Sequence, residues 1–125
     1  MAIKIPMAGM TVLVFPETEV RRGEVIVQGT RWAAFTLRTP DPQLDVTVPL
    51  MPLTRLTPER TRMISIAVHT ARLIAAAISI AYYEERDHRE VVAFATTFEP
   101  FWVAFAAMVR KAVSEAAAAS VEVSA

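Results

Sequence analysis

Arginine and aromatic residues gather between positions 21 and 38, and this combination of residue types is suited to nucleic-acid binding. An aromatic ring stacks on an unpaired base, while a guanidinium group binds the neighbouring phosphate. Six residues make up the candidate binding site: Arg21, Arg22, Arg31, Trp32, Phe35 and Arg38. Their types and spacing predict a surface that holds single-stranded DNA or RNA.

The alternation of side chains along a β-strand divides this set between two faces of a sheet. Arg31 and Phe35 share one face of the expected strand, and Trp32 and Arg38 share the other. If the second face is open, Trp32 and Arg38 stand together on it, and an arginine of the neighbouring hairpin, at position 21 or 22, reaches them. The alternative is that Trp32 lies in the core and the arginines are ordinary surface residues.

Patterns typical of enzymes and metal sites are weak in this chain. It has no glycine-rich phosphate loop, no nucleophile elbow and no helical pair of histidines. Ser65 and His69 are four residues apart, but nucleophilic catalysis also needs an orienting group and an oxyanion site. Glu85 and His88 have the spacing of one half of a di-iron site, yet they lie in a charged segment that favours a solvated turn. We therefore predict no catalytic residue, no metal and no cofactor.

Short β-rich runs separated by proline and glycine occupy the first half of the chain. Four strands are expected, at residues 10–15, 24–28, 31–39 and 44–50. Arg21-Arg22-Gly23 is expected to form a turn, and Pro49 is expected to place the last strand at an edge. The connections are short, which favours an antiparallel meander of three to four strands over residues 10–50.

A long apolar helix is expected to follow the strands. Thr57 is a favourable N-cap and Pro58 suits the first helical position, so this helix begins here and ends near residue 87. Nearly all of its circumference is apolar except for one polar stripe. A surface helix needs an apolar face of only about 100°, so this helix must be covered on more than one side.

A second apolar segment begins near His88 and extends to about Ala118. Residues 90–98 fit helical spacing better than strand spacing, although a strand remains an alternative. Pro100 is expected to kink or break the helix, and Glu99 is expected to cap the helix that follows. Residues 57–118 therefore predict two to three helices.

Together these elements predict one α+β domain over residues 1–125, with the helices packed on one face of the sheet and a frayed tail at residues 120–125. The 125-residue chain is 54% hydrophobic and has a formal net charge of zero, and its mean hydropathy is +0.36. Such surplus apolar surface favours a homo-oligomer, either a dimer or a tetramer.

A membrane location is not expected. Glu99 and Pro100 interrupt the second apolar segment, and His69 with Arg72 lies within the first. The chain has no cysteine, which excludes disulfides and thiol chemistry. The N-terminal segment is too short and too interrupted for a signal peptide, so a cytoplasmic protein is expected.

Strands that carry arginine and aromatic residues, followed by apolar helices in a cysteine-free, arginine-rich chain, resemble the ThermoDBP-related single-stranded DNA-binding proteins of hyperthermophilic archaea. The resemblance rests on Arg31, Trp32, Phe35 and Arg38 and on the helical half of the chain. It implies an oligomer that holds single-stranded DNA in a basic and aromatic groove. The alternative is a non-enzymatic structural or adaptor protein that self-associates through its apolar helices.

Overall fold

The computed structural model describes residues 2–124, and their side chains except those of Arg55 and residues 119–124. The strands and helices follow one another as two groups: β1 (Ile3–Met7), β2 (Met10–Val14), β3 (Glu19–Val27), β4 (Thr30–Arg38), β5 (Val46–Pro52), α1 (Pro58–Tyr83), α2 (His88–Thr96) and α3 (Glu99–Ser124). Short 3-10 turns precede and follow β5. The predicted α+β fold, with helices after strands, is confirmed.

The strands form two antiparallel sheets rather than one. β1 and β2 make a two-stranded hairpin, and β3, β4 and β5 make a three-stranded sheet in that order. Both hairpins turn on two residues in the left-handed region: Ala8 and Gly9 (φ 50° and 82°), and Gln28 and Gly29 (φ 49° and 80°). Such two-residue turns match the twist of antiparallel strands and strongly favour glycine at the second position.

Two expectations about the strands were wrong. Residues 3–7 form a strand that the sequence pattern did not indicate, and Arg21-Arg22-Gly23 lies inside β3 instead of forming a turn. The turn at Gln28 and Gly29 sets a register in which β3 and β4 pair along all nine residues of each strand. Gly23 is paired with Ala34 in this ladder, so a glycine sits within the strand without ending it.

The expected start of α1 and the helical break before Pro100 are confirmed, whereas α1 ends at Tyr83, before residue 87, and Glu99 is the first residue of α3 and not its N-cap. The Thr57 side chain accepts a hydrogen bond from the backbone N–H of Arg60 (3.1 Å) and so caps α1. Residues 90–98 are mainly helical, and the chain breaks between α2 and α3 with a bend of 41°. α3 begins at Glu99, which lies in its first turn. Its backbone continues to Ser124, beyond the expected end near Ala118, and a frayed tail stays a prediction.

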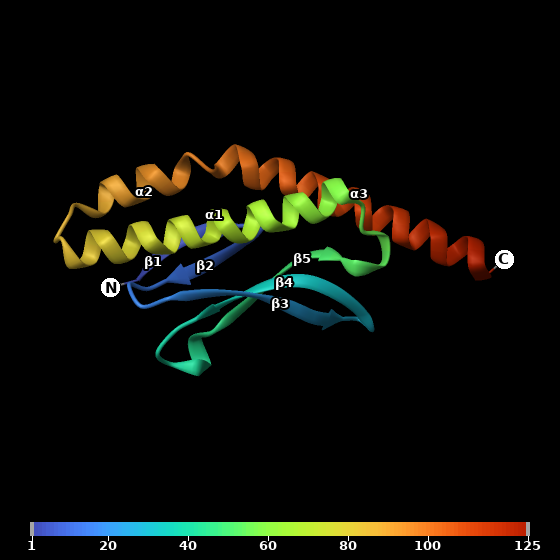
Figure 1. The fold of residues 1–125 in the computed structure, drawn as a ribbon, viewed down its shortest axis with the longest axis horizontal. Helices are drawn as coiled ribbons and strands as arrows, with labels where there is room; N and C mark the ends of the chain where they lie inside the picture. Colours follow the sequence, from blue (N-terminus) through green and yellow to red (C-terminus); the bar gives the residue numbers. More distant parts are fainter. Residues whose placement is uncertain (1, 125) are drawn as a thin grey trace.

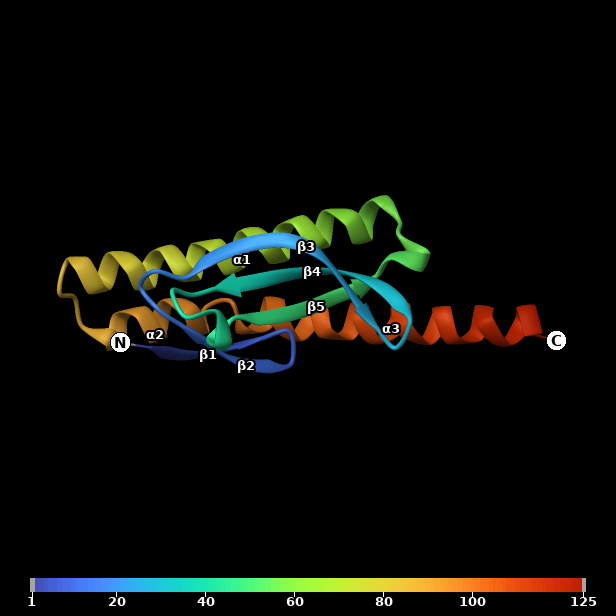
Figure 2. The same cartoon turned by 90° about the horizontal axis from the view of Figure 1, so that it is seen from below.

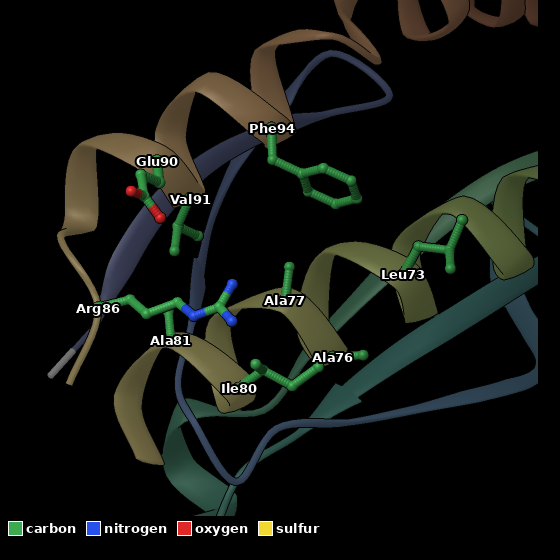
Figure 3. A pocket seen from close by; sticks show the side chains of 9 residues that line it. All are labelled: Leu73, Ala76, Ala77, Ile80, Ala81, Arg86, Glu90, Val91 and Phe94. Atoms are coloured by element: carbon green, nitrogen blue, oxygen red, sulfur yellow. The ribbon is translucent and has the colours of Figure 1, made fainter. Parts of the chain in front are cut away.

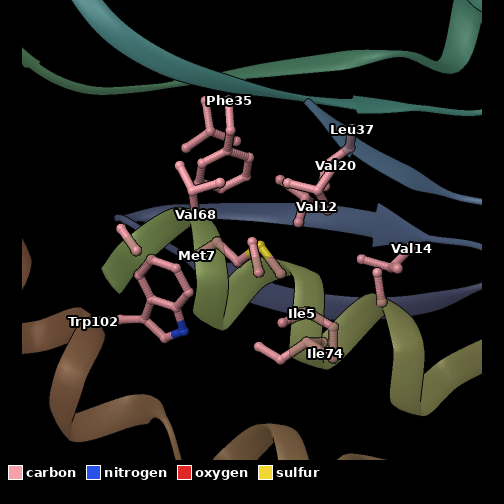
Figure 4. Packing of buried hydrophobic residues seen from close by; sticks show 14 of the residues in the cluster. Ile5, Met7, Val12, Val14, Val20, Phe35, Leu37, Val68, Ile74 and Trp102 are labelled. Atoms are coloured by element: carbon pink, nitrogen blue, oxygen red, sulfur yellow. The ribbon is translucent and has the colours of Figure 1, made fainter. Parts of the chain in front are cut away.

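The helices cover one face of the three-stranded sheet (Figures 1 and 2). α1 packs mainly on β3, α3 packs on β5, and the β1–β2 hairpin lies beside them and contacts α2. The core lies between these layers (Figure 4) and includes the following residues: Met7, Val12, Phe35, Leu37, Val68, Ile74 and Trp102. The other face of the sheet has no covering helix, as Figure 2 shows from below.

Some of the helices are long and apolar enough to span a membrane. Among the described residues this holds for α1 alone and for α2 with α3 taken as one bent pair. In the fold, 44% of the apolar window of α1 is buried inside the protein. Burial inside the protein therefore accounts for less than half of this window, and the absence of membrane insertion stays a prediction.

Candidate functional site

Phe35 does not lie on a binding surface. Its side chain is 0% exposed and lies in the core, where it points from β4 toward α1 (Figure 4). Neighbouring strand positions opposite it are Arg22 on β3 and Val48 on β5. The prediction that Phe35 stacks on a base is therefore corrected: the face of β4 that carries it is the face that the helices cover.

Trp32 is half-buried at the far end of the same strand. It lines a hollow of about 270 Å³ together with Pro52 of β5 and with Val113 and Ala116 of α3. Trp32 and Arg38 share strand parity, as expected, but six residues separate them, which is about 20 Å along a strand. They therefore do not form one compact site, because a nucleotide that stacks on Trp32 is out of reach of Arg38.

Two of the four candidate arginines are neutralised by glutamates. Arg21 Nε donates to Glu19 (3.1 Å), and Arg31 forms an ion pair with Glu24. The hydrogen bond and the charge of Arg21 hold the pKa of the Glu19 carboxyl below its usual range. These four side chains are all exposed, so each pair contributes little to stability, but the pairing reduces the positive charge of the sheet.

The remaining candidate arginines, Arg22 and Arg38, have no carboxylate ion-pair partner within the part of the chain that the structure describes. Arg22 donates to Ser65 Oγ on α1 (3.2 Å) from the edge strand β3. Close by, Arg72 Nε on α1 donates to the backbone carbonyl of Val20 (3.3 Å). Two guanidinium groups thus lie at the seam between α1 and β3, an arrangement that only the packing of the helix reveals.

Two residues at the weak catalytic and metal patterns, Ser65 and Asp87, make structural hydrogen bonds. Ser65 Oγ donates to the carbonyl of Thr61 (3.3 Å) and accepts from Arg22, so its partners do not include His69. Asp87, between Glu85 and His88, caps α2 by accepting from the backbone of Arg89 (3.0 Å). Among the side chains that the structure describes, no group of three or more His, Asp or Glu residues is placed to hold a metal ion.

A mostly apolar groove lies between α1 and α2, and the arginine and aromatic pattern of the sequence did not indicate it. It has a volume of about 450 Å³, and Figure 3 shows the residues that line it: Leu73, Ala76, Ala77, Ile80, Ala81, Arg86, Glu90, Val91 and Phe94. Phe94 reaches toward α1 from α2, and the Arg86 side chain extends over one end. Leu73, Ile80 and Phe94 are 39%, 49% and 38% exposed. We call this feature the α1–α2 groove.

The groove continues a row of exposed apolar residues along α1. Ile66 and Leu73 are seven residues apart, as are Leu73 and Ile80, so the three lie on one side of the helix. Each of them is at least 39% exposed. Some of the surplus apolar residues of the sequence thus lie on the outer surface of the helices. Exposed apolar side chains there do not stabilise a monomer.

Comparisons with protein-family models, with curated proteins and with solved structures found no match to this chain.

Proposed function

We propose that this protein is a non-enzymatic assembly module that self-associates through the outer surface of its helices. The observation that carries the proposal is the exposed apolar row of α1 together with the adjoining α1–α2 groove. Contiguous apolar surface of this kind marks a protein interface more often than it marks a free surface. A second copy of this chain is the occupant that we propose.

The available area supports this occupant. α1 has 26 residues and is therefore about 39 Å long. A strip about 10 Å wide along this helix covers about 400 Å², and a second strip over α2 and the start of α3 doubles that area. The sum is close to the ~800 Å² that each partner contributes to a stable interface of standard size. A net charge of zero also removes general repulsion between two copies.

The substitution Leu73→Glu tests this proposal. We expect the native chain to sediment as a dimer and the variant to dissociate, with a dissociation constant raised by roughly 100-fold, because a carboxylate would be buried at the interface. Sedimentation velocity over a concentration series measures the change, and circular dichroism verifies that the variant is folded.

Leu13→Glu is the matched control. Leu13 lies on β2 and is 36% exposed, close to the 39% of Leu73, but it does not line the α1–α2 groove. This control is expected to keep the native dimer. A native chain that stays monomeric at the highest concentrations, or a Leu73→Glu variant that dimerises normally, would contradict the proposal.

A second candidate function, the binding of single-stranded nucleic acid, is supported by the arginines at the edge of the sheet. Arg22 and Arg72 lie on the seam between β3 and α1, and Arg38 lies on β4 opposite Glu19. In this second proposal their guanidinium groups bind phosphates, while the half-buried Trp32 supplies one stacking surface. Binding without sequence preference is expected, because phosphate contacts carry no base information.

A titration of a fluorescently labelled single-stranded oligonucleotide tests this second candidate. Three phosphate contacts predict that the logarithm of the binding constant falls with the logarithm of salt concentration with a slope of about −2. Arg22→Gln combined with Arg72→Gln should flatten this dependence, whereas Arg31→Gln, which removes a guanidinium already paired with Glu24, should not. The absence of binding at micromolar protein concentration would exclude this function.

A further inference from the structure

The outer row of α1 has a spacing that restricts how a second copy can dock, and the inference that follows rests on the self-association proposed above. Ile66, Leu73 and Ile80 recur at seven-residue intervals and are all exposed. Apolar residues with this repeat pack along the matching row of another helix. Leu73 is equidistant from the other two along the chain, so an antiparallel partner places Ile66 of each copy opposite Ile80 of the other.

The charges at the two ends of the helical layer differ in sign. Four carboxylates and two arginines lie between residues 84 and 90, where α1 meets α2. At the other end of α1, the exposed cations among the described side chains are Arg62 on α1 and Arg110 with Lys111 on α3. The described carboxylates there are Glu59 and Glu115, and Glu115 is paired with Arg60. The ion pair of Arg60 with Glu115 (2.6 Å) shows that this part of α3 lies beside the start of α1.

We infer that two copies pair through α1 in an antiparallel, two-fold arrangement, with Leu73 on the symmetry axis. In this register Arg62 of one copy lies opposite Glu84 of the other, and the acidic end of each helical layer meets the basic end of its partner. A parallel arrangement brings acidic ends together and basic ends together, which is electrostatically unfavourable. The two-fold arrangement uses the same surface on both copies and closes at a dimer.

Single cysteines provide a direct test, because the native chain contains none. A disulfide requires Cα atoms about 4.4–6.8 Å apart. Leu73→Cys places two thiols at the axis and is expected to give a covalent dimer when oxidised glutathione takes up the two electrons. Ile66→Cys alone places the thiols about 21 Å apart along the helix axis and is not expected to cross-link, and the same holds for Ile80→Cys.

A mixture of the Ile66→Cys and Ile80→Cys variants is expected to form the mixed covalent dimer. Non-reducing electrophoresis separates the products, and sedimentation of the reduced variants shows that each still associates. Cross-linking of Ile66→Cys with itself would overturn the antiparallel inference in favour of parallel helices. A native dimer in which none of these cysteines cross-links would also overturn it while leaving self-association intact. A native chain without any dimer would instead reject the proposed function itself.

Discussion

Replacing Phe35 by alanine is expected to lower the free energy of unfolding by about 3–5 kcal/mol. The aromatic ring is fully buried between the three-stranded sheet and the helices, so its removal loses apolar burial and leaves a cavity. Small domains are stable by only about 5–15 kcal/mol, so much of the variant will be unfolded under mild denaturing conditions. Urea denaturation followed by circular dichroism measures the loss as a lower midpoint with an unchanged slope.

Two further variants make this result specific. Phe35→Leu keeps most of the apolar volume and is expected to cost less than the alanine substitution, so it yields a folded protein for binding assays. Thr36→Ala changes the next residue of β4, whose hydroxyl pairs with that of Thr47 (3.1 Å) on the uncovered face, and is expected to cost about 1 kcal/mol or less. A loss below 1 kcal/mol for Phe35→Ala would mean that the ring is not in the core.

Replacing Glu115 by alanine is expected to lower the free energy of unfolding by about 3 kcal/mol. Arg60 is only 8% exposed, and one of its guanidinium nitrogens lies 2.6 Å from the Glu115 carboxylate. The variant would retain a buried positive charge without that carboxylate, and the remaining desolvation penalty accounts for the loss. The contact joins the first turn of α1 to the second half of α3, so hydrogen exchange should rise at both places.

The ion pair of Arg86 with Glu84 is the matched control for this prediction. Its side chains are 57% and 53% exposed, so Glu84→Ala is expected to cost about 1 kcal/mol or less. The double variant Arg60→Met with Glu115→Leu removes the buried guanidinium together with its half-buried partner and should recover much of the stability that Glu115→Ala loses. Equal losses at Glu84 and Glu115 would show that the burial of Arg60 has no energetic consequence.

The helical half of the fold is predictable from the sequence because its signals are local. Thr57 and Pro58 mark the start of α1 through the geometry of a single turn, and Pro100 lies at the break that separates α2 from α3. Each of these helix boundaries depends on residues within a few positions of the signal. Pro49 also indicates an edge strand, because proline lacks the N–H that a central strand would need, and β5 is an edge of its sheet.

The strands were harder to predict because their partners are chosen by the whole fold. Residues 3–7 pair with β2. Arg22 and Gly23 both pair with β4, although the sequence pattern predicts a turn there. An exposed Arg-Arg-Gly segment satisfies the composition of a turn. It lies in a strand here because the tight turn at Gln28 and Gly29 aligns β3 with β4 along its full length.

At the candidate site, the sequence determines the residue types and their alternation along the strand, whereas the tertiary structure decides which residues are buried or paired. Alternation along β4 predicts that Phe35 and Trp32 lie on opposite faces. Only the docking of the helices places Phe35 in the core and Trp32 in a hollow that α3 also lines. The arginine types are visible in the sequence, whereas their neutralisation depends on which glutamate each one meets. For Arg60 that partner is 55 positions away. The composition shows how many apolar residues the chain contains. Only the packing determines how much apolar surface stays exposed and can bind another molecule.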